Sequence, residues 1–130
     1  MQSPRRHARL MNKVTTLVVI VDDDPGVRRA LSRLLLSMSM RTMTFASGEA
    51  LLAESRSVAP TAVLLDLHMP GLRGAALVRA IRLRWPEARI IVMTGHDRPG
   101  SMEDVIGAGA SAYIIKPING EDVATLLRGS

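Results

Sequence analysis

Residues 18–31, VVIVDDDPGVRRAL, join an apolar run to a helical pattern through three consecutive aspartates. The run Leu17–Val21 is apolar at every position, which is typical of a strand buried on both faces of a parallel sheet. Asp24 followed by Pro25 is typical of a helix start, with Asp24 as the capping residue. The segment therefore predicts a buried strand, a polar strand end and a helix in direct succession.

The same alternation of strand and helix patterns continues to the end of the chain. Further apolar runs predict strands at Arg41–Phe45, Thr61–Leu65, Arg89–Met93 and Ser111–Ile115. Helical spacing predicts helices after Asp24, from Ser47 to about Arg56, around Leu77–Trp85, near Met102–Ile106 and from about Asn119 to Arg128. This alternation predicts an α/β fold, a doubly wound five-stranded parallel sheet with helices on both faces.

Length and composition exclude several classes of protein. The chain has 130 residues, 47% of them hydrophobic and 22% charged, which fits one globular domain. It contains no cysteine, so neither a disulfide framework nor a thiolate zinc site can form. Apolar runs such as Leu17–Val21 are far shorter than the roughly 20 residues of a membrane helix, and no signal-peptide pattern is present. We therefore expect a cytoplasmic protein that does not span a membrane.

The net charge of +5 comes largely from the N-terminus. Within residues 1–13 there is no acid, and the basic residues there are Arg5, Arg6, Arg9 and Lys13. The rest of the chain has thirteen basic and twelve acidic residues, so it is nearly neutral. We predict a flexible basic tail at residues 1–13 and one domain at residues 14–128. We expect no direct nucleic-acid binding by that domain, because it has few aromatic side chains for stacking.

Polar side chains follow four of the five predicted strands. They are Asp22–Asp24 after the first strand, Asp66 after the third, Thr94 after the fourth and Lys116 after the fifth. In an open parallel sheet these strand ends meet at the edge where ligands bind. Two carboxylates about 4 Å apart repel by roughly 4 kcal/mol at an effective dielectric constant of about 20, so such a cluster requires a cation. Oxygen ligands predict Mg²⁺, and a carboxylate beside Mg²⁺, a lysine and a hydroxyl group can accept a phosphoryl group.

Four segments together resemble a known family. They are VVIVDDDPGVRRAL (18–31), AVLLDLHMPGLRG (62–74), IIVMTGHDRPG (90–100) and AGASAYIIKPI (108–118). In this order, and at these strand ends, they make residues 14–128 similar to the receiver domain of two-component response regulators. The resemblance implies a flavodoxin-like fold, like that of chemotaxis regulators, with strand order 2-1-3-4-5. The segments TGH (94–96) and KPI (116–118) are most similar to receivers of regulators with a LuxR-like helix-turn-helix output domain.

The resemblance implies a role in phosphorylation for several residues. Asp66 matches the aspartate that a sensor histidine kinase or a phosphotransfer protein phosphorylates. Lys116 matches the lysine that binds the phosphoryl group. Thr94 and Tyr113 match the two switch residues whose side chains respond to it. The chain would then be a regulatory phospho-acceptor that assists its own phosphorylation and dephosphorylation, and not an enzyme.

The resemblance also implies a Mg²⁺ site. Asp22 and Asp23 match the acidic pair that holds the ion, Asp23 directly and Asp22 largely through water. Asp66 would share the ion, and His68 matches the position whose main-chain carbonyl binds it. Asp24 keeps the simpler role of helix cap.

The resemblance places a signalling surface on the predicted helix near Met102–Ile106 and the strand Ser111–Ile115. We expect this face to form a homodimer or to contact an output domain outside this chain; the sequence leaves open whether such a domain follows Ser130 or the receiver stands alone. His68 and His96 each stand two residues after a site residue, and we expect them to shield the phosphoryl group from water.

Three other functions stay open on the sequence alone. A receiver-like binding module that is never phosphorylated would share the fold, although no acid and no lysine of the pattern is missing. A phosphatase of the haloacid dehalogenase type would need a second acid two residues after its nucleophile, where this chain has His68. A nucleic-acid binder would use the basic tail, and the salt dependence of binding with and without residues 1–13 would reveal it.

Overall fold

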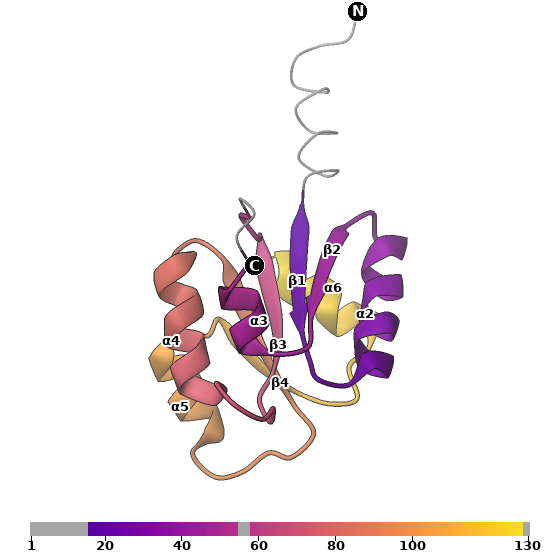
Figure 1. The fold of residues 1–130 in the computed structure, drawn as a ribbon. Helices are drawn as coiled ribbons and strands as arrows, with labels where there is room; N and C mark the ends of the chain where they lie inside the picture. The colour runs from indigo at the N-terminus through magenta and orange to yellow at the C-terminus, as the bar shows by residue number, and fades with distance from the viewer. Residues whose placement is uncertain (1–15, 55–57, 129–130) are drawn as a thin grey trace, which may run out of the picture.

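Five parallel strands form one sheet in the order β2-β1-β3-β4-β5 (Figure 1). The computed structural model describes residues 16–54 and 58–128, so the predicted tail at residues 1–13 lies outside the described residues. The strands are β1 (Leu17–Val21), β2 (Arg41–Phe45), β3 (Ala62–Asp66), β4 (Arg89–Thr94) and β5 (Ala112–Ile115). All neighbouring strands pair in parallel. The predicted fold class, parallel sheet and strand order are therefore confirmed.

Helices cover both faces of this sheet, as Figure 1 shows. They are α2 (Pro25–Ser37), α3 (Gly48–Leu52), α4 (Gly74–Arg84), α5 (Ser101–Ala108) and α6 (Gly120–Arg128). Buried side chains of α3, α4 and α5 pack against one face, and those of α2 and α6 pack against the other. Within the described ranges, no helix has the length and apolar character needed to cross a membrane.

Strand β1 shows why both faces of the sheet are covered. Val19 and Val21 belong to the core under α3, α4 and α5, while Val18 and Ile20 belong to the core under α2 and α6. Successive side chains of a strand point to opposite faces, so an unbroken apolar run leaves no face for water. The prediction of a strand buried on both sides is confirmed.

Local capping sets where two of the helices begin. The Asp24 carboxylate accepts hydrogen bonds from the backbone N–H groups of Gly26 at 2.8 Å and Val27 at 3.4 Å, which confirms its predicted role as helix cap. The Ser47 hydroxyl accepts a hydrogen bond from the backbone N–H of Ala50 at 3.0 Å. These side chains satisfy backbone donors that have no partner in the first turn of a helix.

Three helices differ from their predicted bounds. Helix α4 begins at Gly74 rather than near Leu77. Helix α3 ends at Leu52, before the predicted end near Arg56, which is itself outside the described residues.

Helix α5 is longer than predicted and includes Gly107. Burial of Val105 and an acidic first turn at the positive end of the helix dipole stabilise it despite that glycine. Gly109 ends α5 with a φ of 121°, a conformation that favours glycine.

One arginine ties together the edge of the sheet where the strands begin, which we call the amino edge. Arg82, near the end of α4, donates through Nη1 to the carbonyl oxygens of Ala88 at 2.6 Å and Pro86 at 2.9 Å. Its Nη2 and Nε donate to the carbonyl oxygen of Gly109 at 2.7 and 3.2 Å. The turns that lead into β4 and β5 are therefore anchored to α4.

The start of β1 and the end of α6 both lie at the amino edge. The first residue of β4, Arg89, donates through Nε to the carbonyl oxygen of Leu126 at 2.7 Å, close to the end of α6.

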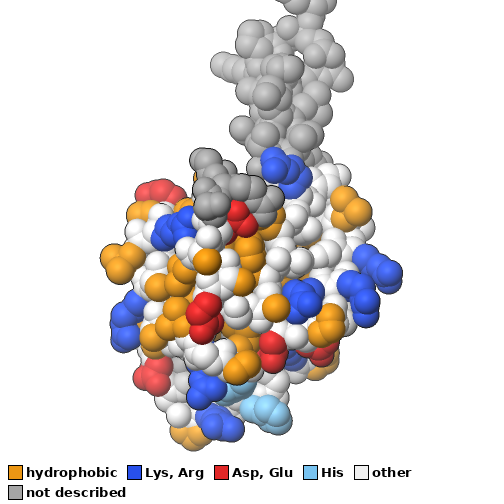
Figure 2. Space-filling model, in the orientation of Figure 1, with side chains coloured by type: hydrophobic (Ala, Val, Ile, Leu, Met, Phe, Trp, Pro, Cys, Tyr) orange, Lys and Arg blue, Asp and Glu red, His pale blue; other side chains and the backbone are white. Residues whose placement is uncertain are grey.

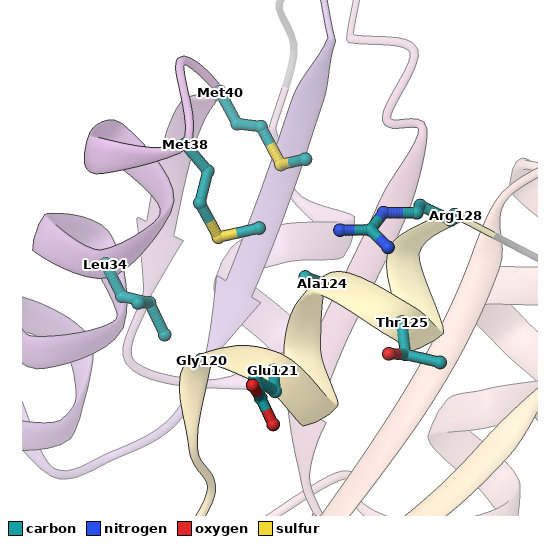
Figure 3. A pocket seen from close by; sticks show the side chains of 8 residues that line it. All are labelled: Leu34, Met38, Met40, Gly120, Glu121, Ala124, Thr125 and Arg128. Atoms are coloured by element: carbon teal, nitrogen blue, oxygen red, sulfur yellow. The ribbon is translucent and has the colours of Figure 1, made fainter.

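Helices α2 and α6 leave a pocket of about 700 Å³ between them (Figure 3). Glu121 and Arg128 both line this pocket, so its lining carries charges of opposite sign.

Candidate functional site

Four predicted site residues lie together at the carboxyl edge, where the strands end. Asp66 and Thr94 are the last residues of β3 and β4, and Asp22 and Lys116 directly follow β1 and β5. Asp22, Asp66 and Thr94 are 1%, 6% and 0% exposed. They are the buried polar residues within the described ranges. Buried polar side chains require hydrogen-bond or ionic partners. The polar residues at this edge therefore form an organised site and are not merely solvated strand ends.

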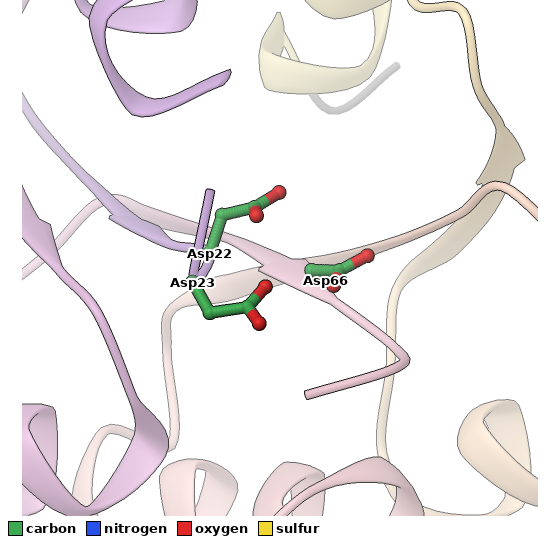
Figure 4. A group of neighbouring side chains, drawn as sticks. All are labelled: Asp22, Asp23 and Asp66. Atoms are coloured by element: carbon green, nitrogen blue, oxygen red, sulfur yellow. The ribbon is translucent and has the colours of Figure 1, made fainter. Parts of the chain in front are cut away.

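Three carboxylates form an acidic cluster at this edge (Figure 4). One oxygen from each of Asp22, Asp23 and Asp66 lies within 4.8 Å of the others. Carboxylate oxygens are the ligands that hard divalent cations prefer, and mutual repulsion favours a cation between them. The donor set therefore fits Mg²⁺, as the sequence predicted.

Lys116 bridges two of these carboxylates. Its Nζ lies 3.0 Å from Oδ2 of Asp22 and 3.2 Å from Oδ1 of Asp66. Burial raises the pKa of the Asp66 carboxyl; Lys116 opposes this rise, while Asp22 and Asp23 reinforce it. Burial alone would lower the pKa of Lys116, but the hydrogen bond to Asp22 and the charges of both carboxylates raise it. Lys116 is thus held as a cation beside an aspartate whose ionisation is costly.

Asp22 is fixed by more contacts than the sequence indicated. Its Oδ1 accepts a hydrogen bond from the backbone N–H of Asp24 at 2.9 Å, and its Oδ2 contacts Lys116. Its main-chain carbonyl accepts a hydrogen bond from Nη1 of Arg28 at 2.7 Å. Both carboxylate oxygens of Asp22 are therefore engaged, which agrees with a mainly water-mediated role toward a metal. The contact of Arg28 was missed, because an arginine in the first turns of an amphipathic helix resembles any solvated one.

The two switch residues lie on neighbouring strands, where the Thr94 hydroxyl acts on the pKa of the Tyr113 phenol, and each residue also has a further hydrogen-bond partner. The Thr94 hydroxyl donates to the carbonyl oxygen of His96 and accepts from the backbone N–H of the same residue, both at 3.0 Å. The Tyr113 hydroxyl donates to Oδ1 of Asp97 at 2.7 Å. Burial raises the pKa of the Tyr113 phenol, and Asp97 raises it further. Sequence reasoning missed Asp97, since no spacing rule pairs a loop carboxylate with a tyrosine on another strand.

Two exposed histidines lie on the loops that follow β3 and β4. His68 Nε2 lies 3.3 Å from the carbonyl oxygen of His96, and the two ring centroids are 6.4 Å apart. The structure thus brings the two histidines together. The predicted shielding of the phosphoryl group requires them to be neighbours. The assignment of the His68 main-chain carbonyl as a metal ligand stays a prediction.

A parallel sheet in this order, with an acidic cluster and a lysine at its carboxyl edge, defines a receiver domain. The chain belongs to the response regulator receiver domain family, which it matches over residues 18–128. Known relatives are consistent with this assignment. The DNA-binding transcriptional regulator NtrC of Salmonella typhimurium is 33% identical over 111 residues, which make up 85% of this chain and 24% of NtrC. The chain therefore spans about a quarter of the length of that relative.

Solved structures share the fold. The chemotaxis protein CheY4 of Vibrio cholerae has a TM-score of 0.80 at 25% identity, covering 87% of this chain and 96% of that one. A response regulator of Burkholderia pseudomallei, solved with a phosphorylated aspartic acid, a calcium ion and citrate, has a TM-score of 0.81 at 23% identity. That match covers 88% of this chain and 67% of the other. The finer resemblance to receivers of the LuxR-like branch stays a prediction.

Proposed function

We propose that the chain receives a phosphoryl group on Asp66 from a sensor histidine kinase or a phosphotransfer protein. The observation that carries this proposal is the position of one buried carboxylate. Asp66 lies 3.2 Å from Lys116 and within 4.8 Å of the carboxylate oxygens of Asp22 and Asp23. A nucleophile, a fixed cation and an acidic metal-binding pair thus meet at one point. The solved response regulator of Burkholderia pseudomallei, which has the same fold, carries a phosphorylated aspartic acid.

The transfer forms one bond and breaks another. A carboxylate oxygen of Asp66 attacks phosphorus, and the P–N bond to the donor imidazole breaks with its electron pair staying on the ring nitrogen, which takes a proton from solvent. Lys116 holds a phosphoryl oxygen and offsets its negative charge. Thr94, buried at the end of β4, turns its hydroxyl from His96 toward a second phosphoryl oxygen. The roles are those predicted for Asp66, Lys116 and Thr94.

A divalent cation completes the charge balance of this proposal. When bound, Mg²⁺ would neutralise part of the negative charge of the phosphoryl oxygens. Asp23 and Asp66 would hold it directly, together with the main-chain carbonyl of His68. Asp22, whose oxygens already contact Asp24 and Lys116, would act largely through water.

An apolar surface next to Lys116 suits the approach of the donor protein. A cavity of about 420 Å³ lies there, and its lining residues are Val27, Ala30, Leu31, Lys116, Pro117 and Ile118. A protein that inserts an apolar side chain into this cavity would bring its phosphohistidine to the edge of the site. This supports a macromolecular donor in addition to small phosphodonors.

We assign the surface that passes the signal to a partner to the face formed by α5 and β5. Three large apolar side chains are exposed there: Met102 at 47%, Ile106 at 43% and Ile115 at 53%. Tyr113 and Asp97 line a cavity of about 660 Å³ on the same face. Once Thr94 moves toward the phosphoryl group, the Tyr113 ring turns inward and leaves Asp97, which reshapes this face. We expect the reshaped face to form a homodimer or to contact an output domain.

The wider biological setting is part of the same proposal. A receiver domain at residues 14–128, together with the basic residues 1–13, would act in the cytoplasm as a regulatory module rather than as an enzyme. The similarity to the DNA-binding transcriptional regulator NtrC supports an output in transcription, through a domain other than this receiver.

The alternative is a receiver-like binding module that is never phosphorylated, and one labelling experiment separates the two. Acetyl phosphate with Mg²⁺ should add a single phosphoryl group to the wild type, seen by intact-mass measurement. Asp66→Asn should abolish the addition, while Asp104→Asn, at an exposed position of α5, should not. Full labelling of Asp66→Asn would assign the phosphoryl group elsewhere, and no labelling of the wild type would favour the binding module.

A further inference from the structure

One edge of the molecule is strongly basic and lies outside the phosphorylation site. Residues 25–48, which include α2 and β2, contain four arginines and neither aspartate nor glutamate. The nearly neutral domain therefore carries an uneven charge distribution. Figure 2 shows Lys and Arg side chains gathered on the flank where Figure 1 places α2.

Three of the four arginines of this edge lack the main-chain contacts that hold Arg28 of α2 and two arginines of α4. On α4, Arg82 and Arg84 donate to main-chain carbonyls, Arg84 to those of Leu52 at 2.6 Å and Glu54 at 2.8 Å. Arg29, Arg33 and Arg41 are exposed, and their guanidinium groups bind no other residue in the described ranges. These three cations are therefore available to a partner.

A groove runs between α2 and β2 beneath these arginines. One cavity of about 510 Å³ lies toward the start of α2, and a second of about 360 Å³ lies toward its end. Ser32 and Arg33 line both cavities, so the two are neighbours along α2. Leu36 lines the second cavity and is 72% exposed. A large apolar side chain within a groove, rather than alone on a convex surface, indicates a contact area.

Strand β2 adds an unpaired sheet edge to this surface. It is the outermost strand and pairs only with β1 in the described part of the chain. One row of its backbone groups therefore faces away from the sheet, as in any edge strand that can receive another polypeptide.

We propose that this arginine groove, formed by Arg29, Arg33, Leu36 and Arg41, binds an acidic segment of a partner protein that places an apolar side chain on Leu36. Charge complementarity selects an acidic occupant, and the exposed leucine selects a polypeptide over a polyanion. No aromatic side chain lines the two cavities of the groove, so a nucleic acid would find no stacking surface there.

The end of the groove that holds Leu36 lies away from the phosphorylation site. Leu36 and Arg41 lie at the end of α2 and the start of β2, at the amino edge, whereas Asp66 ends β3 at the carboxyl edge. The other cavity, lined by Pro25 and Arg29, extends to the start of α2 and thus toward the carboxyl edge. The proposed contact with Leu36 does not depend on the phosphorylation proposed above.

Binding of a designed probe tests the proposal. The probe is a fluorescein-labelled synthetic peptide of glutamates with leucines at helical spacing, followed by fluorescence anisotropy at two salt concentrations. We expect salt-sensitive binding to the wild type, with amide shifts in NMR spectra confined to α2 and β2. Arg33→Glu with Arg41→Glu should weaken binding at least about tenfold. Leu36→Ser should weaken binding of this peptide but not of a leucine-free glutamate peptide.

A matched charge change on another surface provides the control. Arg79→Glu with Arg98→Glu alters exposed arginines of α4 and of the loop before α5 by the same charge, and should change binding by less than about twofold. Equal weakening by the two pairs would overturn the proposal, and so would amide shifts outside α2 and β2. Tighter binding of a DNA duplex through the same arginines would overturn the assignment of the partner as a protein. Melting curves and acetyl phosphate labelling of each variant establish that the fold and the Asp66 site are intact.

Discussion

The two edges of the sheet each hold a cationic side chain that joins separate elements, and they use it differently. At the carboxyl edge, Lys116 lies between the carboxylates of Asp22 and Asp66. At the amino edge, Arg82 donates to main-chain carbonyls of the turns before β4 and β5. The first arrangement gathers like charges around one cation, and the second satisfies neutral acceptors. The difference shows that a half-buried cation can support chemistry in one place and folding in another.

Charge decides which role each edge plays. The carboxylates of the carboxyl edge repel one another, so the unphosphorylated, metal-free protein carries an unfavourable electrostatic energy there. The carbonyls at the amino edge carry no net charge, and each would lose a partner without the guanidinium. We therefore expect mutations at the carboxyl edge to change reactivity and those at the amino edge to change stability.

The largest expected effect is on the rate of phosphorylation, which should depend on the carboxyl edge and not on the amino edge. Lys116→Met should slow phosphorylation of Asp66 by acetyl phosphate about 100- to 1000-fold, because a fixed positive charge on the phosphoryl oxygens is lost. Arg82→Met should leave the rate unchanged per folded molecule. Quench-flow sampling with intact-mass measurement gives both rates. Comparable losses in the two variants would erase the distinction between the edges.

The next largest effect is on the free energy of unfolding, which should depend on the contacts of Arg82 at the amino edge. Arg82→Met should lower the free energy of unfolding by about 2–4 kcal/mol, since three carbonyl groups of two turns lose their donor. Arg79→Met, at an exposed position of the same helix, should stay within about 0.5 kcal/mol of the wild type. Urea unfolding measures both. A stable Arg82→Met protein would mean that the turns are held by other contacts.

A smaller effect depends on pH. The folded protein holds the Asp66 proton more tightly than the unfolded chain, because burial raises the pKa of this carboxyl. Ionisation of Asp66 therefore costs stability as the pH rises through its folded pKa, and Asp66→Asn removes that cost. Without metal, the variant should be more stable than the wild type at pH 7, by less than about 1 kcal/mol after solvent screening.

The gain should shrink as the pH falls toward the ordinary carboxyl pKa of 3.8, and Mg²⁺ should stabilise the wild type more than the variant. Urea unfolding between pH 4 and 8 tests this. A destabilised Asp66→Asn protein at pH 7 would show that the contact with Lys116 outweighs the cost of burial.

The smallest effect concerns the lifetime of the phosphoryl group. His68→Ala with His96→Ala should speed its loss a few-fold, since the two neighbouring rings no longer shield the site from water. Ser111→Ala removes an acceptor of the Ile90 backbone N–H at the amino edge and should leave the lifetime unchanged. Loss of label over time measures both. A slower or equal loss in the histidine variant would rule out shielding.

The sequence predicted the carboxyl edge far better than the amino edge. Asp22, Asp66, Thr94 and Lys116 could be placed together because strand ends of a parallel sheet converge, and unbroken apolar runs mark those strands. Arg82 could not be recognised, because its partners are backbone carbonyls, which every residue possesses. The same holds for the pairing of Tyr113 with Asp97, which depends on the loop conformation after β4.

Helix bounds were predictable where a side chain caps the helix and less so elsewhere. Asp24 and Ser47 carry visible capping oxygens, and both helices begin where expected. The length of α5 was underestimated, because Gly107 suggested an end while burial of Val105 and the turn at Gly109 determine the actual one. Tertiary packing overrode local propensity at that point.

The position of the start of β1 and the end of α6, both at the amino edge, has a practical consequence for attachment. A fusion partner, an affinity tag or a solid support joined at either end of the domain is held on the side opposite the acidic cluster. A linker would have to cross the full height of the sheet before its cargo could obstruct Asp66. Immobilised protein therefore presents the phosphorylation site to solution. This suits surface-based measurements of donor binding, whichever end of the domain is coupled to the surface.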